Sequence, residues 1–487
     1  MKHTLNKSII HALYLALVIL VTPISAKMEK KIVVAITSFN NKDWYKKNLD
    51  SVFKQNYTNY RIIYIDDCSP DGTGKLVQAY LIENEQMGRT TLVLHPEWKS
   101  QMFNHYLAVY MCEDDEIVCH LDGDDEFYDE NTLNIINDYY LNYDIWLTVG
   151  SPLLSNGHRM SLIQSNMYEI VEKNSYRKDG WYFNHLRTFY AWLFKLIKLE
   201  DLLYQGNFAN MSPAPDVAIM YPMYEMAGRH GAMLPELLYI VNIKNPLSQI
   251  YLTPQPKILE LANTIRFEWP EYAPLYAPVK NRMKQYENKK ADCIFWAESL
   301  KPSIAKSIKT TLANLTHINA IYIIYEDKGR KIAKDLEFLK SELPECTFIA
   351  HDPNTTFLSA LLQHILEITS DYLIFASAHC QLEHPIDICQ CIKELERTFA
   401  YGFYLHLNYR DDLANLCVPL SDSLIAWQPG YAKNVWDFPN ELGMILYRKK
   451  DVAEKIKAMK YFKISEFIEQ WAHQEMAERT VGLFYKN

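Results

Sequence analysis

Strand-like and helix-like segments alternate from residue 31 onward. Residues 31–37 read KIVVAIT and residues 61–67 read RIIYIDD, and both are continuous apolar, β-branched runs typical of buried strands. Between them, DWYKKNLDSVFKQ places its apolar side chains at helical spacing. Strand, helix and strand at this interval predict an α/β fold with a mostly parallel sheet, flanking helices and right-handed crossovers. Ligands of such sheets bind beyond the carboxyl ends of the strands.

The residues just after these strands are polar where a core would require apolar groups. Thr37-Ser38-Phe39-Asn40 follows the first strand, and Asp66-Asp67-Cys68-Ser69-Pro70-Asp71-Gly72 follows the second. A further strand, EIVCHL, runs into Asp122-Gly123-Asp124-Asp125-Glu126. Four acids so close together at the mouth of a buried strand are costly without a cation. Oxygen-rich clusters suit Mg²⁺ or Mn²⁺, which can also bridge a diphosphate.

Charge and length restrict the class of protein. The chain has 487 residues, which at ~100 to 200 residues per domain predicts two or three globular units. Its 50 basic and 59 acidic side chains give a net charge of −9, the wrong sign for a protein that neutralises nucleic-acid phosphates. Glycine is scarce, at 15, and the sequence has no G-x-x-x-x-G-K-[ST] phosphate loop. A metal or a local basic pocket is therefore needed if phosphates are handled.

The cysteines predict neither a disulfide framework nor a zinc site. Their number, nine, is odd, no C-x-x-C pair occurs, and Cys389 and Cys391 are too close for a zinc knuckle. Because cysteine often serves as a small buried hydrophobe, we expect free thiols.

The first 26 residues form a hydrophobic targeting element. Residues 9–26 read IIHALYLALVILVTPISA, with lysines on both sides. The apolar run before Pro23 is shorter than the ~20 residues that span a bilayer, and Ile24-Ser25-Ala26 offers a signal-peptidase site. A cleaved signal peptide is favoured over an N-terminal anchor, and both remain open. The protein is thus expected to be exported or membrane-associated, on a side of the membrane that the flanking charges do not decide.

A second set of strand and helix segments begins near residue 291. Prolines scattered over 251–290 indicate a linker or packing arm, after which DCIFWAE, AIYIIYED and DYLIFAS repeat the intervals of the first set. The sequence predicts a duplication, with domains over 31–250 and 291–487. In the second copy Ala378-His379-Cys380 replaces the acidic cluster, so no metal site is expected there.

Three motifs in order resemble the family 2 glycosyltransferases, which have a GT-A fold. They are VVAITSFNNKDWYKKNLDSVFKQNY, YRIIYIDDCSPDGT and HLDGDDEF, and a D-x-D triplet alone would be a weak signal. The resemblance implies that Asp122 and Asp124 are the D-x-D pair, with Asp124 the more direct ligand of a Mn²⁺ or Mg²⁺ ion that holds the donor diphosphate. The other residues expected to bind the nucleotide-sugar are Thr37, Phe39, Asn40, Asp67, Asn104, Asp122, His185 and Arg187.

A further resemblance concerns the acceptor side. Residues 212–242 are similar to the family segment in which an acidic residue opens a helix below the acceptor, and this implies that Asp216 is the catalytic base. The usual Glu-Asp pair is here Pro215-Asp216. An inverting transfer needs such a base to take the proton of the acceptor hydroxyl. Each of three residues also has a structural alternative to its functional role. Asp216 can be the N-cap of its helix, Asp67 can be a turn residue, and Asn104 can be an amide on a helix surface.

The combined prediction is a metal-dependent, inverting glycosyltransferase with a nucleotide-diphosphate sugar as donor, UDP-sugar favoured. The acceptor is a glycan, a lipid or a protein. Two alternatives remain at this point. One is a non-catalytic nucleotide-sugar or glycan-binding protein on GT-A-like domains. The other is a nucleotidyltransferase, although the TSFNNKDWY loop lacks the glycines that would hold a triphosphate.

Overall fold

Strand β1 (Ile32–Ser38) lies inside the first sheet, between β2 and β4, and is buried along its whole length. Its apolar, β-branched sequence suits a strand that is covered on both faces. In the computed structural model, the residues described are 28–160, 167–211, 214–247, 254–297, 299–326, 332–351, 357–407, 417–429, 443–459, 471 and 479–486.

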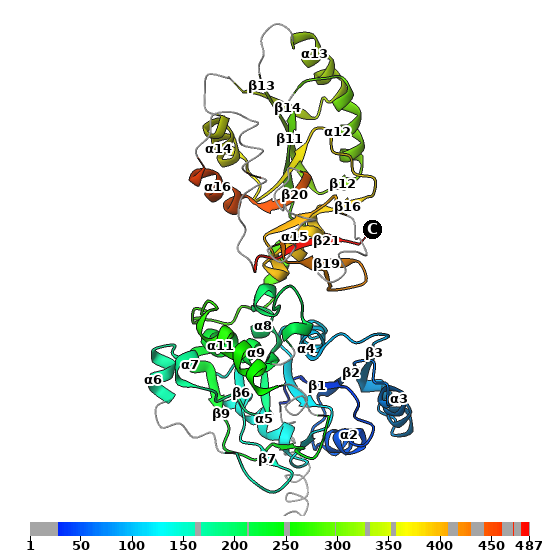
Figure 1. Cartoon of the computed structure of the whole chain (residues 1–487), viewed down its shortest axis with the longest axis vertical. Helices are drawn as coiled ribbons and strands as arrows, with labels where there is room; N and C mark the ends of the chain where they lie inside the picture. Colours follow the sequence, from blue (N-terminus) through cyan, green and yellow to red (C-terminus); the bar gives the residue numbers. More distant parts are fainter. Residues whose placement is uncertain are drawn as a thin grey trace, which may run out of the picture.

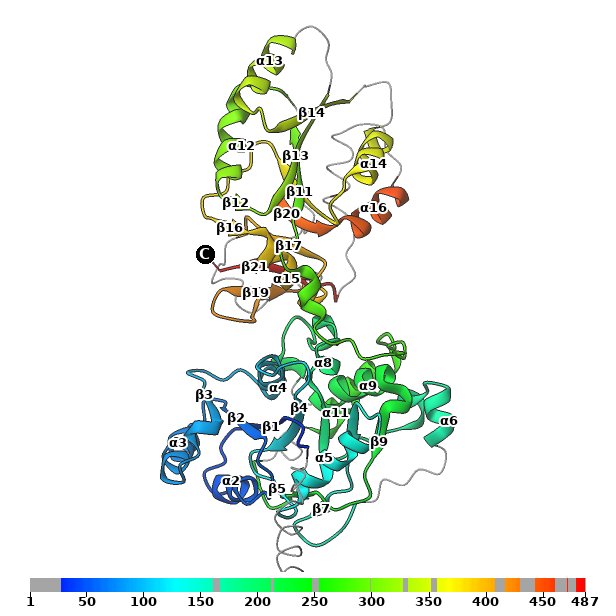
Figure 2. The ribbon, with the colours of Figure 1, turned by 180° about the vertical axis from the view of Figure 1, so that it is seen from behind.

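The molecule has two lobes, one above the other in Figures 1 and 2. The first lobe contains a seven-stranded sheet in the order β3-β2-β1-β4-β8-β6-β9. Only β8 runs against the other strands, since it pairs antiparallel with both β4 and β6. The α/β prediction with a mostly parallel sheet is confirmed. The other strands are β2 (Tyr60–Asp66), β3 (Thr90–Leu94), β4 (Ile117–Asp122), β6 (Leu147–Val149), β8 (Arg187–Tyr190) and β9 (Gly231–Met233).

A small sheet and a set of helices complete the first lobe. The small sheet has the order β5-β10-β7, with β5 (Glu126–Phe127), β10 (Tyr239–Val241) and β7 (Leu153–Leu154). The helices are α2 (Tyr45–Phe53), α3 (Thr73–Glu83), α4 (Gln101–Tyr110), α5 (Thr132–Asn142), α6 (Met167–Glu172), α7 (Tyr176–Asp179), α8 (Ala191–Phe194), α9 (Pro215–Ala227) and α11 (Gln255–Phe267).

Helix α11 occupies part of the segment that we expected to be a linker over 251–290. It buries Leu261 and Ile265 and packs against α9 and α7. The buried Arg177 side chain donates to the carbonyl of Ile265 at 2.7 Å. Residues 255–267 therefore belong to the first lobe, because an amphipathic helix gains stability by burying its apolar side.

The second lobe repeats the topology of the first sheet. Its nine strands have the order β14-β13-β11-β15-β20-β17-β21-β19-β18, and the first seven match the first sheet in order, direction and sequence along the chain. The strands are β11 (Ala291–Ala297), β13 (Ile318–Glu326), β14 (Cys346–His351), β15 (Tyr372–Ser377), β17 (Gly402–Tyr404), β18 (Cys417–Pro419), β19 (Leu424–Trp427), β20 (Gly443–Arg448) and β21 (Gly482–Tyr485). The helices are α12 (Ser303–Ala313), α13 (Ala333–Glu342), α14 (Phe357–Glu367), α15 (Ile388–Thr398) and α16 (Lys449–Ala458), and β12 (Leu315–Thr316) pairs with β16 (Ile386–Asp387).

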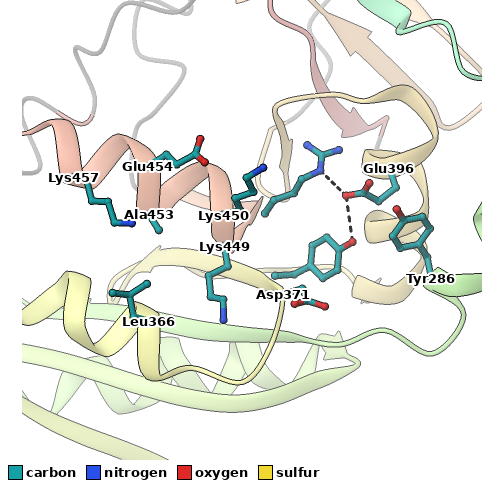
Figure 3. Close-up of a pocket in the computed structure, with 11 residues that line it drawn as sticks. Tyr286, Leu366, Asp371, Glu396, Lys449, Lys450, Ala453, Glu454 and Lys457 are labelled. Atoms are coloured by element: carbon teal, nitrogen blue, oxygen red, sulfur yellow. Dashed lines mark hydrogen bonds and ion pairs between the residues drawn. The ribbon is translucent and has the colours of Figure 1, made fainter. Parts of the chain in front are cut away.

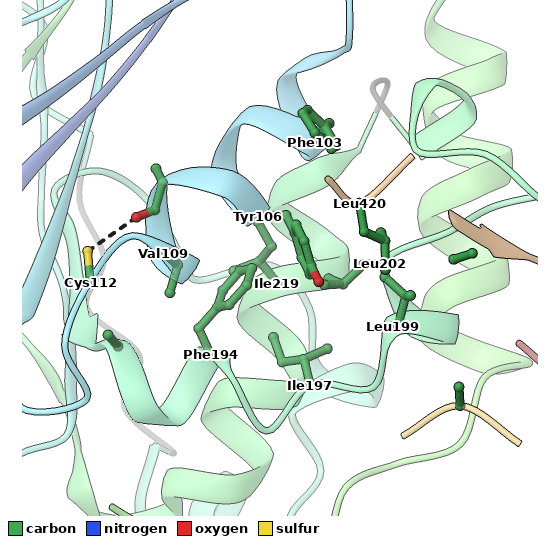
Figure 4. Close-up of a cluster of buried hydrophobic side chains, with 14 of the residues drawn as sticks. Phe103, Tyr106, Val109, Cys112, Phe194, Ile197, Leu199, Leu202, Ile219 and Leu420 are labelled. Carbon is green, nitrogen blue, oxygen red and sulfur yellow. Dashed lines mark hydrogen bonds between the residues drawn. The ribbon is translucent and has the colours of Figure 1, made fainter. Parts of the chain in front are cut away.

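One hydrophobic core runs through the contact between the lobes. Tyr106 and Leu202 of the first lobe belong to the same buried cluster as Leu420 of the second (Figure 4). The guanidinium of Arg397 on α15 lies 4.8 Å from the centre of the Tyr110 ring and hydrogen-bonds the Tyr106 hydroxyl. Both tyrosines are on α4, so the second lobe packs directly on a helix that flanks the first sheet.

Two further sequence predictions concern the cysteines and the N-terminal segment. All nine cysteines are free thiols, as expected. The targeting element over 1–26 lies outside the described residues. Within the part of the chain that the structure describes, no helix is long and apolar enough to cross a membrane.

Candidate functional site

The acidic turn lies at the carboxyl end of β4, next to the end of β1. Thr37 and Asp122 are partners in the parallel pairing of these strands. The amide of Gly123 donates to the carbonyl of Thr37 at 3.0 Å. A Cβ atom on Gly123 would lie 2.7 Å from Nδ2 of Asn41, so only glycine lets the turn approach β1 this closely.

Side-chain amides and a tyrosine hold this turn in place. The Nδ2 atom of Asn48 on α2 donates to the carbonyls of Asp122, at 2.9 Å, and Asp125, at 2.8 Å. The amide of Asp122 donates to the hydroxyl of Tyr239 at 3.1 Å, and the Asp125 carboxylate accepts from the amide of Asn242 at 2.7 Å. These hydrogen bonds fix the directions in which the carboxylates of Asp122 and Asp124 point.

The four acids of the turn do not form a single cluster. Asp125 is buried beneath the turn, where its carboxylate binds a backbone amide. Glu126 lies in β5, opposite Ile240 of β10, and its side chain is 3.7 Å from Lys47. Asp125 and Glu126 are therefore held by other groups of the protein, although burial and the charges of Asp124 and Asp122 raise the pKa of Asp125. Asp122 and Asp124 are the two candidates that remain for an ion.

The pair Asp122 and Asp124 fits a hard divalent cation. Burial, together with the negative charges of Asp216 and Asp124, raises the pKa of Asp122 to about 7. Burial also raises the pKa of Asp124, whose carboxylate accepts from Nδ2 of Asn245 at 2.7 Å. Carboxylate oxygens that repel each other favour Mg²⁺ or Mn²⁺, which commonly use one or two carboxylates and take their other ligands from phosphates and water.

In the described part of the chain, this pair has no third His, Cys, Asp or Glu side chain placed to hold an ion with it. Among the residues that the structure describes, no group of three or more His, Cys, Asp or Glu side chains is arranged to hold an ion. His185 is the nearest further donor, with Nε2 3.8 Å from an oxygen of Asp122.

Arg187, His185 and Asp216 surround the acidic turn on its acceptor side. Arg187 lies on β8, opposite His120 of β4, and its Nη1 atom is 2.6 Å from an oxygen of Asp216. Burial alone would raise the pKa of Asp216, but the positive charge of Arg187 holds it below its usual value. Asp216 lies in the first turn of α9, where a carboxylate also interacts favourably with the helix dipole.

The imidazole of His185 is neutral and held by stacking. Its ring lies 4.6 Å from the Tyr239 ring, at an interplanar angle of 23°. Burial, followed by repulsion from Arg187, lowers the pKa of His185 to about 3. His105 and His120 stack behind the site at 4.4 Å, and burial lowers the pKa of His105 to about 4. These rings form an uncharged wall beside Asp216.

Asp67 and Asn104 are more deeply enclosed than the motifs suggested. The two oxygens of Asp67 accept from the amides of Lys99, at 2.7 Å, and Ser100, at 2.9 Å, so Asp67 holds the start of α4. Asn104 is buried in α4, with Oδ1 3.0 Å from Nε2 of His95. The alternative of a helix-surface amide is therefore wrong for Asn104. No described contact joins Asn104 to the acidic turn.

The remaining predicted donor residues lie after β1. Thr37 is buried beside Asp122, whereas the Phe39 side chain is 43% exposed. The amide of Asn40 donates to the Ser69 hydroxyl at 2.9 Å, which joins the loops that follow β1 and β2. The structure thus brings these predicted residues to one edge of the sheet.

Several residues of the site escaped the sequence prediction. Asn48, Tyr239, Asn242 and Asn245 hold the acidic turn, yet each is remote from it along the chain. The only local signal was YIVNIKN, in which a short strand leads into two asparagines.

Comparison with known proteins agrees with this geometry. A model of the glycosyl transferase family 2 matches residues 33–197, the segment that contains β1, the acidic turn and Arg187. Residues 33–197 form a family 2 glycosyltransferase domain. The family assignment covers this segment of the first lobe. Glycosyltransferase GlyG of Streptococcus pneumoniae serotype 4 is 26% identical over 218 residues, which cover 42% of this chain and 67% of GlyG.

Two solved structures are also similar to the chain. TarS 1-349 of S. aureus, in complex with UDP-GlcNAc, has 16% identity and a TM-score of 0.36 over 48% of this chain and 66% of that one. The mannosyltransferase PcManGT of Pyrobaculum calidifontis, in complex with GDP-Man and Mn²⁺, has 14% identity and a TM-score of 0.32 over 53% of this chain and 76% of that one. The chain thus spans just under two thirds of the TarS fragment.

The second lobe has no counterpart of the acidic pair. Ser377 is the last residue of β15 to pair with β11, as Asp122 is the last residue of β4 to pair with β1. The amide of Ala378 donates to the carbonyl of Trp296, as that of Gly123 donates to the carbonyl of Thr37. The strand register therefore places Ser377, rather than Ala378, at the position of Asp122. The conclusion that this lobe lacks the glycosyltransferase acids at this position is unchanged.

A separate pocket of about 430 Å³ lies at the other end of the second sheet. It is lined near the start of β15 and the end of β20, where Glu396 pairs with Arg448 at 2.5 Å and with the Tyr372 hydroxyl at 3.2 Å (Figure 3). Asp371, at its rim, pairs with Lys289. This pocket is distinct from the candidate site of the first lobe.

Proposed function

We propose that the protein is a metal-dependent, inverting glycosyltransferase that uses a nucleotide-diphosphate sugar. One observation carries this proposal: two kinds of carboxylate meet at one edge of the first sheet. Asp122, beside Asp124, has a raised pKa and repels its neighbours, whereas Asp216 is held ionised by Arg187. The first pair suits a cation and the second suits proton transfer.

Asp122 and Asp124 are proposed to hold Mn²⁺ or Mg²⁺. When bound, such an ion neutralises charge on the diphosphate as the sugar–phosphate bond breaks. The protein's own contribution is to aim both carboxylates, through Asn48 and Tyr239 on the backbone of Asp122 and through Asn245 on Asp124. Holding these groups in place before the donor arrives reduces the cost of ordering them during the reaction.

Asp216 is proposed to accept the proton of the acceptor hydroxyl. Its low pKa keeps it deprotonated at neutral pH, and the pairing with Arg187 fixes its orientation. Attack by that hydroxyl on the anomeric carbon, opposite the leaving diphosphate, inverts the configuration. The neutral His185, beside Asp122, is proposed to contact donor or acceptor oxygens without adding charge.

The base of the donor is proposed to lie after β1 and β2. Phe39 supplies an exposed ring there, with Thr37 and Asn40 beside it. Asp67 still has free lone pairs after accepting from Lys99 and Ser100. We favour a UDP-sugar as donor, on the resemblance of these motifs.

A donor screen tests the proposal directly. Hydrolysis and transfer from a panel of UDP- and GDP-sugars are followed by mass spectrometry with Mn²⁺, with Mg²⁺ and with EDTA. Asp124→Ala should abolish metal-dependent turnover. Asp115→Ala, which removes an exposed carboxylate at the opposite end of β4, is the matched control. Equal turnover by wild type and Asp124→Ala would contradict the proposed role of Asp124 in metal binding.

A second variant separates the base from the donor site. Asp216→Asn should abolish transfer while UDP affinity stays close to wild type. Loss of both together means that Asp216 has a structural or donor-binding role. Absence of any donor turnover, with sugar binding retained, favours instead a non-catalytic binding protein.

The cellular location is proposed from the N-terminal segment alone. We propose that residues 9–26 direct export or membrane association. Fractionation and N-terminal sequencing of the expressed protein distinguish a cleaved signal from a retained anchor. The acceptor is proposed to be a glycan, a lipid or a protein.

A further inference from the structure

A large aromatic side chain stays exposed beside the proposed base. Trp181 lies in the loop between α7 and β8, and 39% of its surface is exposed. Its ring nevertheless contacts Phe183 edge-on at 5.1 Å and Tyr221 edge-on at 6.0 Å. The Trp181 ring is thus held by two aromatic neighbours and by the guanidinium of Arg187, which lies 5.9 Å from its centre, while part of its surface stays exposed to solvent.

The loop that carries Trp181 is held on both sides. Gly180 has φ of 134°, a conformation that favours glycine, and its carbonyl accepts from the Tyr221 hydroxyl at 2.7 Å. Tyr221 belongs to α9, the helix that begins beside Asp216. The indole is therefore positioned by the same helix as the proposed base, which lowers the entropy cost of using it in binding.

Trp181 is also near Asp216 in space. The guanidinium of Arg187 lies 5.9 Å from the centre of the Trp181 ring and its Nη1 atom lies 2.6 Å from Asp216. Tyr221 is five residues after Asp216 on α9, which at the rise of an α-helix is roughly 7 Å along the axis.

The chemistry of this surface selects among the three acceptor classes. A pyranose ring has a face of C–H groups and a rim of hydroxyls, so it can stack on an indole while a hydroxyl reaches a carboxylate. The charge of Arg187 is already balanced by Asp216, which leaves this cation unsuited to an anionic lipid head group. The flat indole ring of Trp181 lies next to the proposed base Asp216, and this arrangement matches a saccharide.

We propose that Trp181 is a stacking platform for the acceptor, and that the acceptor is a saccharide. This inference rests on the proposed role of Asp216 as base. Trp181 stacks on the sugar unit that carries, or directly neighbours, the attacking hydroxyl. It acts on acceptor binding and leaves the donor site untouched.

Saturation-transfer NMR with methyl glycosides of glucose, galactose and N-acetylglucosamine tests the platform without turnover. The full chain is compared with Trp181→Phe, Trp181→Ala and Tyr276→Ala, the last of which removes an aromatic ring that is 99% exposed elsewhere. We expect wild type, Trp181→Phe and Tyr276→Ala to bind at least one glycoside. Trp181→Ala should bind the glycoside about tenfold more weakly, because the variant loses the stacking interaction with the indole ring.

A kinetic arm separates failure of the platform from failure of the proposed function. Hydrolysis of the donor in the absence of acceptor should be equal in wild type and Trp181→Ala, while the KM for the glycoside acceptor rises about tenfold in the variant. The platform is overturned if no glycoside binds to wild type, if Trp181→Ala binds equally well, or if donor hydrolysis falls in parallel. Glycoside binding that depends on Trp181, without any donor hydrolysis, upholds the platform and refutes the transferase proposal.

Discussion

Arg187 and Asp216 form a close ion pair, with Nη1 of the arginine 2.6 Å from Oδ1 of the aspartate. The arginine is almost fully buried, whereas 35% of the aspartate side chain is exposed. This arrangement places a fixed cation behind a carboxylate that keeps access to solvent. The orientation of Asp216, and its ionisation at neutral pH, therefore depend on a residue from the first sheet.

Replacing Arg187 should move the pH dependence of transfer. In Arg187→Met the carboxylate loses the charge that lowers its pKa, so the pH below which kcat/KM falls should rise. The rate at neutral pH should drop by roughly 10²-fold, as for loss of a positioned acid–base group. Arg187→Lys keeps the charge and should retain part of the activity. An unchanged acidic limb in Arg187→Met would count against the pairing as the cause.

Binding of Mn²⁺ should weaken as the pH falls below about 7, the pKa to which burial and neighbouring charges raise Asp122. The sign follows from competition, because the ion requires the deprotonated carboxylate. Without metal, the raised pKa also means that stability contributed by protonated Asp122 is lost as the pH rises through about 7. Thermal shift with and without Mn²⁺ from pH 5.5 to 8 measures both effects. Asp122→Asn should reduce the pH dependence, and the raised pKa of Asp124 accounts for what remains.

A buried ion pair in the first lobe should matter for stability alone. Arg177 and Glu225 are both buried and 2.5 Å apart, and Arg177 also donates to the carbonyls of Ile265 and Trp269. Glu225→Leu should cost about 3 to 5 kcal/mol in free energy of unfolding, because a buried charge loses its partner. Arg177→Met with Glu225→Leu should recover much of this loss in urea denaturation. Activity per folded molecule should stay unchanged in the double variant.

Arg397 should couple the two lobes. Its guanidinium contacts the Tyr106 hydroxyl and the Tyr110 ring, and Glu394 lies 2.6 Å away. Arg397→Ala should destabilise the contact by roughly 2 kcal/mol, the size of a desolvated cation–π interaction. Calorimetry should show a lower first transition, and Arg397→Lys should restore part of it. A single unshifted transition would argue against coupling through α4.

The repeating strands could be predicted from sequence because burial on both faces requires long apolar, β-branched runs. β1, β2, β4, β11, β13 and β15 all overlap the segments that this pattern indicated, with ends that differ by one or two residues. Helix α11 was missed because the prolines around it suggested an irregular segment. Its pairing with α9 depends on burial of two apolar residues, which local composition does not show.

The sequence predicted the residue types of the candidate site better than the arrangement of those residues in space. Asp122, Asp124 and Asp216 stood out because each follows a strand or opens a helix. The partners of Asp124 and Asp216 did not, since Asn245 and Arg187 reach these carboxylates only through the fold. Asp67 was expected to bind the nucleotide-sugar, with a local turn as the alternative, and its hold on the start of α4 was not predicted.

The sequence by itself determined the α/β class, the duplicated strand pattern and the family motifs, because these depend on short-range periodicity and on residues adjacent in the chain. Tertiary structure alone decided which of the acids remain available to an ion, which carboxylate is held ionised and which aromatic ring stays exposed beside it. Those properties depend on burial and on charges brought together from distant segments, and the interaction of a carboxylate with a neighbour depends on their separation in space.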